Sequence, residues 1–187
     1  MIQTKNDLKH YLQEDLKRNQ LKYPILQKIS YSENYRIYRY IKILRHYEYY
    51  YNNRIWYNII PYLYYKLLYR RNIVKTNIFI YPNTYGPGLQ IMHPGFRRSN
   101  LMVHAGKNCT LLPMILLGKK RPGITGNINI GDNCYISTGV TILGPVNIGN
   151  NVTIAAGAVV LHDIPDNCVV GGIPAKILKY KQNEGVQ

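Results

Sequence analysis

The chain has 187 residues, a formal charge of +15 and 46% apolar residues, with 19 Tyr against 2 Phe. This apolar content is that of a globular protein and excludes a chain that is disordered throughout. The three cysteines are odd in number and have no CxxC spacing, which argues against a disulfide framework or a zinc site and favours a reducing compartment.

Two compositional halves meet near Lys75. Residues 1–76 hold 15 of the 24 Lys and Arg, 5 of the 9 acidic residues and 15 of the 19 Tyr. Such a basic half suits an anionic partner (nucleic acid, a lipid surface or a phosphorylated substrate), but it suits a solvated helical surface equally well. No RNP motif, zinc-finger spacing or helix-turn-helix pattern is present, so we expect no nucleic-acid partner. We predict an α-helical domain over 1–76 and a second domain over 77–187.

Three helical patterns occupy the first half. The stretch TKND (4–7) predicts a helix start, because a threonine N-cap is followed three residues later by an acid. Residues 34–53 and 54–71 predict two more helices, and Pro61 should kink or break the second. The apolar stripes of these helices need partners, which could be one another, the following domain or another subunit.

No segment is suited to cross a membrane. The most apolar run, residues 55–69, is too short and too polar to span a bilayer, although it could lie on the surface of one. The start of the chain is charged throughout, unlike a signal peptide. We expect a cytoplasmic protein, with residues 34–71 as a candidate for peripheral contact with the inner face of the membrane.

A six-residue repeat dominates the second half. From Ile124 to Pro165 the sequence divides into seven units, ITGNIN to VLHDIP, in which position one is Ile or Val and position five is aliphatic, Ala or Cys. β-branched residues at a fixed position favour short strands, while Gly, Asn and Asp between them favour turns. Six residues can form one face of a parallel β-helix, and three faces close a triangular coil. The frame places Cys134, and Cys109 upstream, in the inward fifth position.

The repeat has irregularities at both ends. Upstream, HPGFRR to LGKKRP tiles in the same frame from His93, and Gly123 is one extra residue, so we predict a loop pushed out of a coil corner around 118–123. Insertions in solenoids gather where ligands bind, which makes this loop a candidate site. After Val160 the pattern ends in GGIPAKI, which we interpret as a cap on the stack.

The hexads and the ending GGIPAKI resemble the left-handed β-helix acyltransferases. Within them, NTYGPGLQIMHPG (83–95) and the basic, Tyr-rich helices before it are most similar to the serine acetyltransferase-like branch, which includes proteins that look like O-acetyltransferases of surface-polysaccharide pathways. The resemblance implies a mainly-β fold, a left-handed parallel β-helix preceded by helices. It also implies a homotrimer or higher multiple, in which acetyl-CoA lies in a groove between neighbouring β-helices.

The resemblance assigns roles to particular residues and implies no metal. His93 matches the general base that takes a proton from the acceptor hydroxyl, a task that suits a group titrating near neutrality. The coenzyme should meet small corner residues and nearby lysines: Gly118, Lys119, Lys120, Ser137, Ala155, Ala156, Gly157 and Lys176. For the acceptor we expect contributions from Arg97, Asn100 and Arg121.

Departures from the branch bear on the acceptor. Serine acetyltransferases carry an Asp that orients the base, and Phe79 stands at that position here. Met92 replaces an acid directly before the histidine, and Lys120-Arg121 replace an Arg-His pair in the loop. We therefore expect a hydroxyl of a sugar or surface-glycan precursor as the acceptor, and the orienting partner of His93 stays unidentified.

Three alternatives remain open at this stage. One is a serine O-acetyltransferase of cysteine biosynthesis. Another is a non-catalytic β-helix scaffold, which would not bind CoA. A third is a metal hydrolase like the gamma-class carbonic anhydrases, but His93, His104 and His162 lack the close spacing of that class.

Overall fold

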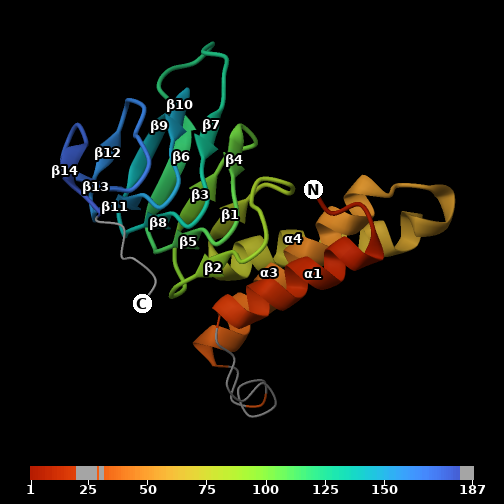
Figure 1. The fold of residues 1–187 in the computed structure, drawn as a ribbon. Coiled ribbons are helices and arrows are strands. Elements are labelled where there is room, and N and C mark those ends of the chain that lie inside the picture. Colours follow the sequence, from red (N-terminus) through yellow and green to blue (C-terminus); the bar gives the residue numbers. More distant parts are fainter. Residues whose placement is uncertain (20–28, 30–31, 182–187) are drawn as a thin grey trace.

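The computed structural model of the chain describes residues 1–19, 29 and 32–181. In Figure 1 the helices lie at one end of a stack of short strands. They are α1 (Lys5–Arg18), α3 (Glu33–Asn52), the 3-10 turn η1 (Trp56–Asn58) and α4 (Ile59–Thr76).

The helix ends follow from the local sequence. Thr4 Oγ1 accepts a hydrogen bond from Asp7 N (3.0 Å) and Asp7 Oδ2 accepts one from Thr4 N (2.8 Å), which confirms the predicted capping box. The expected kink or break at Pro61 is wrong, because α4 starts at Ile59 and Pro61 lies in its first turn, where a helix needs no N–H donor. At the other end, Asn77 takes the left-handed conformation (φ 56°) that commonly ends a helix.

The strands form three sheets that face one another as a triangular prism. In order along each sheet, the first holds β1 (Ile78–Ile80), β3 (Arg97–Ser99), β6 (Ile115–Lys119), β9 (Thr141–Gly144) and β12 (Val159–Val160). The second holds β4 (Val103–Ala105), β7 (Ile128–Ile130) and β10 (Val146–Ile148). The third holds β2 (Gln90–Ile91), β5 (Thr110–Leu111), β8 (Tyr135–Ile136), β11 (Thr153–Ile154), β13 (Cys168–Gly171) and β14 (Lys176–Tyr180). All pairs are parallel except β13 with β14, where the chain turns back and caps the stack.

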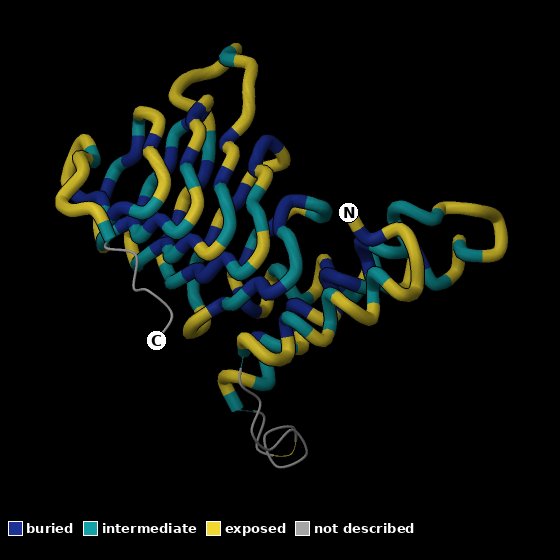
Figure 2. The backbone as a smooth tube through the Cα atoms, in the orientation of Figure 1, coloured by how far each residue is buried: buried dark blue, intermediate teal, exposed yellow. Residues whose placement is uncertain are grey.

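The inward residues of the repeat make a continuous core (Figure 2). From Ile128 to Ile164, positions one and five of every unit are at most 8% exposed. Cys109 and Cys134 are both 1% exposed, which confirms their predicted place in the core. Burial also raises the pKa of both thiols, so neither is suited to be a nucleophile.

Most of the first predicted unit, ITGNIN, lies outside the stack, and only its last two residues, Ile128 and Asn129, belong to β7. Ile124 is only half-buried, and residues 120–127 form a loop between β6 and β7 that projects from the prism in Figure 1. The equivalent turn one coil later, between β9 and β10, is Pro145 alone. The predicted loop is therefore present, but it is longer than the one extra residue that the frame indicated, and the core repeat starts at Ile128.

A buried ion-pair network joins the helices to the first coil. The Arg45 guanidinium donates to Asp15 Oδ2 (2.8 Å) and Glu48 Oε2 (2.9 Å), and all three side chains are at most 1% exposed. Arg45 also donates to the carbonyl oxygens of Tyr85 (2.9 Å) and Gly86 (2.7 Å). Buried residues of α3 and α4 belong to the same hydrophobic cluster as the coils, although α4 and β1 lie on either side of the predicted domain boundary at residue 76.

Candidate active site

His93 lies in the turn between β2 and β3, on the edge of the prism where the third sheet meets the first. We call this row of turns the site edge. Ile91 pairs with Leu111, and Arg97 pairs with Ile115, so this turn has two more residues than the turn above it. The extra residues lift His93 out of the prism with φ 61°, and its side chain is 67% exposed. The upstream frame gives His93 the first position of a hexad, which is buried in the later coils, and this longer turn is the reason that His93 is exposed instead.

The side chain of His93 has an acidic partner from the helical region. His93 Nδ1 lies 2.8 Å from Glu33 Oε1, and Glu33 is the first residue of α3. Ser32 caps this helix, since its Oγ accepts from Tyr35 N, and the cap fixes where α3 begins. A carboxylate accepts the proton on Nδ1, which leaves Nε2 of the neutral ring as a proton acceptor. Glu33 is therefore an acidic partner of His93, which neither Phe79 nor Met92 can be.

Arg97 supports the turn from below instead of facing an acceptor. Arg97 is 1% exposed, and its guanidinium donates to the carbonyl oxygens of Met92, Gly95 (3.1 Å) and Leu111 (3.3 Å). Burial lowers the pKa of Arg97 to about 10, and its Nε has no hydrogen-bond partner among the described residues. The expectation that Arg97 contacts the acceptor is corrected: it fixes the backbone on both sides of His93.

Helix α1 holds the strand that leads to His93. Asp15 Oδ1 accepts from Leu89 N (2.8 Å), and the Asn19 side chain donates to Leu89 O (2.9 Å) and accepts from Ile91 N (3.3 Å). Gln90 Nε2 donates to Arg18 O (2.7 Å). Asn19, Gln90 and Met92 also line a small cavity of about 230 Å³ that includes His93. The helical region thus supplies part of the surroundings of the histidine.

Small residues continue the site edge above His93. The turns of the third and fourth coils contain Ser137, Ala155, Ala156 and Gly157. Hydrogen bonds link each turn to the one in the coil below: Gly157 N donates to Thr138 O (2.9 Å), and Gly139 N donates to Pro113 O (3.1 Å). Lys176 pairs with Gly171 beside the capping turn of the fifth coil. Strands stack about 4.8 Å apart, so the row rises about 19 Å from His93 to this turn. The structure brings these five predicted residues to one edge with His93.

The other predicted residues lie on different parts of the chain. Gly118 and Lys119 end β6, while Lys120 and Arg121 belong to the projecting loop at the edge between the first and second sheets. Lys120 Nζ donates to Leu161 O (2.5 Å) on that edge. Asn100 follows β3 at the same edge, and its Oδ1 accepts from Leu101 N (2.7 Å). Within one chain, none of these residues shares the site edge with His93.

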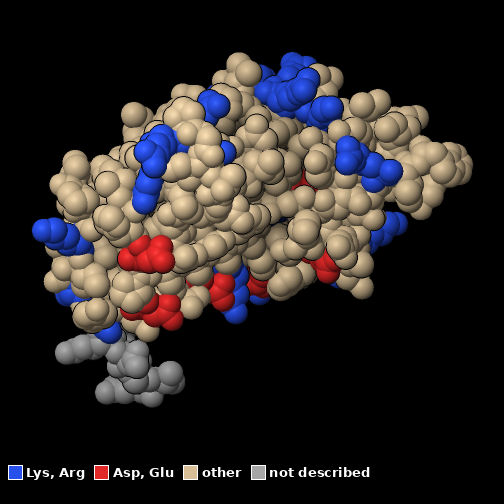
Figure 3. All heavy atoms as spheres, turned by 90° about the horizontal axis from the view of Figure 1, so that it is seen from above, with Lys and Arg blue, Asp and Glu red and all other residues tan. Residues whose placement is uncertain are grey.

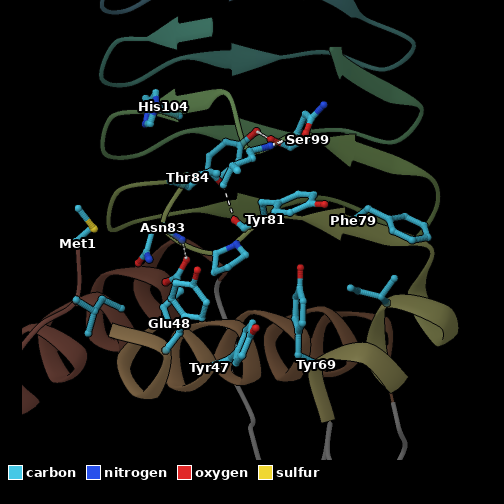
Figure 4. A pocket seen from close by; sticks show the side chains of 18 of the residues that line it. Met1, Tyr47, Glu48, Tyr69, Phe79, Tyr81, Asn83, Thr84, Ser99 and His104 are labelled. Atoms are coloured by element: carbon cyan, nitrogen blue, oxygen red, sulfur yellow. Dashed lines mark hydrogen bonds between the residues drawn. The ribbon is translucent and has the colours of Figure 1, made fainter. Parts of the chain in front are cut away.

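A larger cleft lies between the helices and the first coil (Figure 4). Its volume is about 800 Å³, and Asn100 is among the residues that line it. Tyr47 and Tyr69 rise from the helices toward Tyr81 and Ser99 of the coil. Tyr69 donates to Ile80 O (2.5 Å), and its ring stacks on Tyr47 with centroids 4.9 Å apart, which ties α3 and α4 to β1.

Neither metal chemistry nor a membrane-spanning helix finds support in the described part of the chain. No group of three His, Cys, Asp or Glu in residues 1–19, 29 and 32–181 could hold a metal ion. Within the same residues, no helix is both long and apolar enough to cross a bilayer. His104 and His162 are exposed on the second sheet and on the edge beside it.

Local sequence patterns indicate only part of what Arg97 and Glu33 do. Arg97 occupies an inward fifth position of the upstream frame, which predicts burial. The stretch SEN (32–34) has the N-cap and first-turn acid of a helix start, but 60 residues separate Glu33 from His93, and no local pattern shows that they meet.

Comparisons with known proteins agree with this architecture. The model for the bacterial transferase hexapeptide (six repeats) matches residues 127–162. Serine acetyltransferase of Neisseria gonorrhoeae is 23% identical with a TM-score of 0.70, over 97% of this chain and 71% of that chain. Serine acetyltransferase of Brucella abortus in complex with coenzyme A is 22% identical with a TM-score of 0.76, over 95% and 70%. The chain has the fold of the serine acetyltransferases.

This serine acetyltransferase fold confirms the predicted left-handed parallel β-helix with a helical region before it. Soybean serine acetyltransferase complexed with serine is 25% identical with a TM-score of 0.70, over 92% of this chain and 70% of that chain. Sequence comparison with curated proteins gives no significant match.

Proposed function

We propose that the protein is an acetyl-CoA-dependent O-acetyltransferase in which His93 is the general base. The observation that carries this proposal is the His93–Glu33 pair at the foot of a row of small residues on one edge of the β-helix. The solved structures of this fold support it, because they are acetyltransferases and the Brucella abortus one contains coenzyme A.

The reaction follows from the chemistry of the pair. His93 Nε2 accepts the proton of the acceptor hydroxyl as that oxygen forms a bond to the thioester carbonyl carbon. The carbon–sulfur bond then breaks, and the proton passes from the imidazolium to the thiolate of CoA. The products are an O-acetyl ester and free CoA. Glu33 acts as a positioning residue, since its carboxylate holds the ring and favours the imidazolium that forms in between.

The coenzyme is expected along the site edge. Ser137, Ala155, Ala156 and Gly157 have side chains small enough to let a pantetheine arm approach their backbone N–H groups. Lys176 beside the capping turn is an exposed cation for a phosphate of CoA. Lys119 at the end of β6 and the loop residues Lys120 and Arg121 would reach this edge only from a neighbouring subunit, so the proposal includes a homotrimer or a multiple of it. Light scattering of the purified protein tests the assembly.

The acceptor has two candidates. We propose a hydroxyl of a sugar or surface-glycan precursor, because Phe79 and Met92 stand where serine-specific enzymes keep acids that assist the base and recognise the ammonium group of serine. L-Serine is the second candidate, favoured by the structural likeness to serine acetyltransferases, one of them complexed with serine. We place either reaction in the cytoplasm, where acetyl-CoA is made.

One assay separates these readings. Release of free CoA thiol from acetyl-CoA is followed with L-serine or with a panel of sugars and nucleotide sugars as acceptors. Turnover with L-serine alone would contradict the glycan proposal. Full activity of His93→Ala would contradict the mechanism, and failure of CoA to bind in a titration would indicate a non-catalytic scaffold.

A further inference from the structure

Helix α4 has two apolar faces, and only one of them is packed against other residues that the structure describes. The inner face repeats every seven residues and contains Tyr62, Tyr69 and Thr76, which are at most 9% exposed. The outer face carries large apolar residues at helical spacing, each 54–85% exposed: Trp56 of η1, then Ile60, Leu63, Tyr64, Leu67 and Val74. Monomeric soluble proteins rarely expose so many large apolar side chains side by side. We call this outer face, including Trp56, the α4 face.

Positive charge accompanies the α4 face. Four of the 18 residues of α4 are basic, namely Lys66, Arg70, Arg71 and Lys75, and none is acidic. The sequence from residue 49 to residue 131 contains no acidic residue at all. None of the ion pairs in the described part of the chain involves the four cations of α4. In Figure 3 most of the visible acidic side chains lie along one edge of the molecule with some basic ones beside them, and other basic side chains lie on parts of the surface without acid.

We propose that the α4 face docks on the surface of a membrane that contains anionic lipid. Apolar side chains flanked by Lys and Arg are the pattern of a helix that lies in the plane of the interface. Trp56, Tyr57 and Tyr64 are aromatic residues of the kind enriched at the level of the headgroups. No described helix spans a bilayer, so the contact would be peripheral.

A second copy of the chain is a poorer occupant of this face. A two-fold symmetric contact places the same patch of each copy against the other. The cations of one α4 would then lie close to the cations of the next, with no acid on either helix to pair with them. An anionic lipid surface gains from the same charges, because juxtamembrane Lys and Arg are attracted to it.

Docking through α4 would also orient the protein. Helix α4 leads directly into β1, the first strand of the stack, and the His93 turn belongs to the first coil. A membrane under α4 would therefore lie at the helical end of the molecule, near the coil with His93 and far from the cap. This inference does not depend on the proposed reaction.

The only Trp of the sequence is Trp56, so its fluorescence reports on the α4 face directly. The purified full-length protein is mixed at low salt with vesicles of phosphatidylglycerol and phosphatidylcholine in equal parts, or of phosphatidylcholine alone. We expect a blue shift of the Trp56 emission and sedimentation with the anionic vesicles only, both weakened at high salt. Absence of binding to the anionic vesicles, or equal binding to both kinds, would overturn the proposal.

Paired variants identify the surface that binds. Leu63→Glu with Leu67→Glu should lower the vesicle partition coefficient at least tenfold, while Leu178→Glu, an equally exposed leucine on β14, should not. Arg71→Gln with Lys75→Gln should lower it more than Lys107→Gln with Lys179→Gln, which removes the same charge from the β-helix. If Leu67→Glu instead reduces the mass of the assembly in light scattering and leaves vesicle binding unchanged, the face is a contact between copies and the proposal is wrong.

Discussion

Replacing Arg45 by methionine tests how the helical region is attached to the β-helix. Arg45 is fully buried between Asp15 and Glu48, and it donates to the backbone carbonyl groups of Tyr85 and Gly86, in the segment between β1 and β2. Methionine fills much of the same volume, so the main effect is to leave two carboxylates buried without their counter-ion. Removing one partner of a buried ion pair costs about 3–5 kcal/mol. A folded domain has a total stability of only about 5–15 kcal/mol, so the loss should be large.

Urea unfolding followed by circular dichroism measures this loss. With a slope of about 1–3 kcal/mol per molar urea, a loss of about 3–5 kcal/mol should lower the unfolding midpoint by about 1–5 M at equal protein concentration. Burial already raises the pKa of Glu48 against the attraction of Arg45. A buried carboxylate with a raised pKa stabilises the fold at low pH and loses this contribution as the pH rises, so acidification should narrow the gap between the variant and the parent.

Arg39→Met on the same helix is the matched control, because Arg39 is exposed. The free energy of unfolding of this variant should stay within about 0.5 kcal/mol of that of the parent. A loss below about 1 kcal/mol for Arg45→Met would show that the network does not hold the helices on the first coil.

Three further predictions concern the site and the tyrosines. Glu33→Gln should lower kcat by roughly tenfold and should leave the unfolding midpoint unchanged. This magnitude is the low end for loss of a hydrogen bond to a charged group, because water reaches both side chains. An equal fall of kcat for Glu14→Gln, a surface acid on α1, would refute the role of Glu33. Ala156→Arg should weaken CoA binding by roughly tenfold or more in a calorimetric titration without loss of folding, and unchanged affinity would place the coenzyme elsewhere. Burial raises the pKa of Tyr47 to about 12 and also raises the pKa of Tyr40, Tyr69 and Tyr85, so these groups ionise more easily in the unfolded chain. The stability of the fold should therefore fall as the pH rises above about 10. The circular dichroism signal and the tyrosinate absorbance should change together.

The repeat made the fold predictable because its information is local. The residue types within each hexad indicate which of its positions point inward, and a coil contacts only the coils next to it. The burial of Ile130, Ile136 and Ile142 could therefore be predicted without knowledge of the other parts of the chain. The frame failed where the chain changes length at an edge. Ile124 kept the pattern of the repeat but lies in the long loop, and two added residues moved His93 from the inside to the outside.

The helical contribution to the site could not be predicted in the same way. Glu33 and Asn19 reach the His93 strand from segments 60 or more residues earlier, and nothing in their local sequence distinguishes them from ordinary caps and surface residues. Arg97 is the opposite case, because its fifth position in the upstream frame indicates burial, although we expected it to contact the acceptor. A buried arginine is costly unless its donors are used, and the carbonyl groups of the lengthened turn provide the acceptors.

Because all coils have the same height, the number of coils fixes the distance between the two ends of the site edge. Equivalent residues of successive coils, such as Ile136 and Ile154, are 18 residues apart and pair in register. One coil can therefore be removed or added as a unit without changing how its neighbours pair. Each such step moves the capping turn by about 4.8 Å relative to His93 and changes nothing else on the edge. The number of coils between His93 and Lys176 therefore sets the length of ligand that can touch both, and a chain shortened by residues 137–154 would keep its histidine and its cap but fit a shorter molecule.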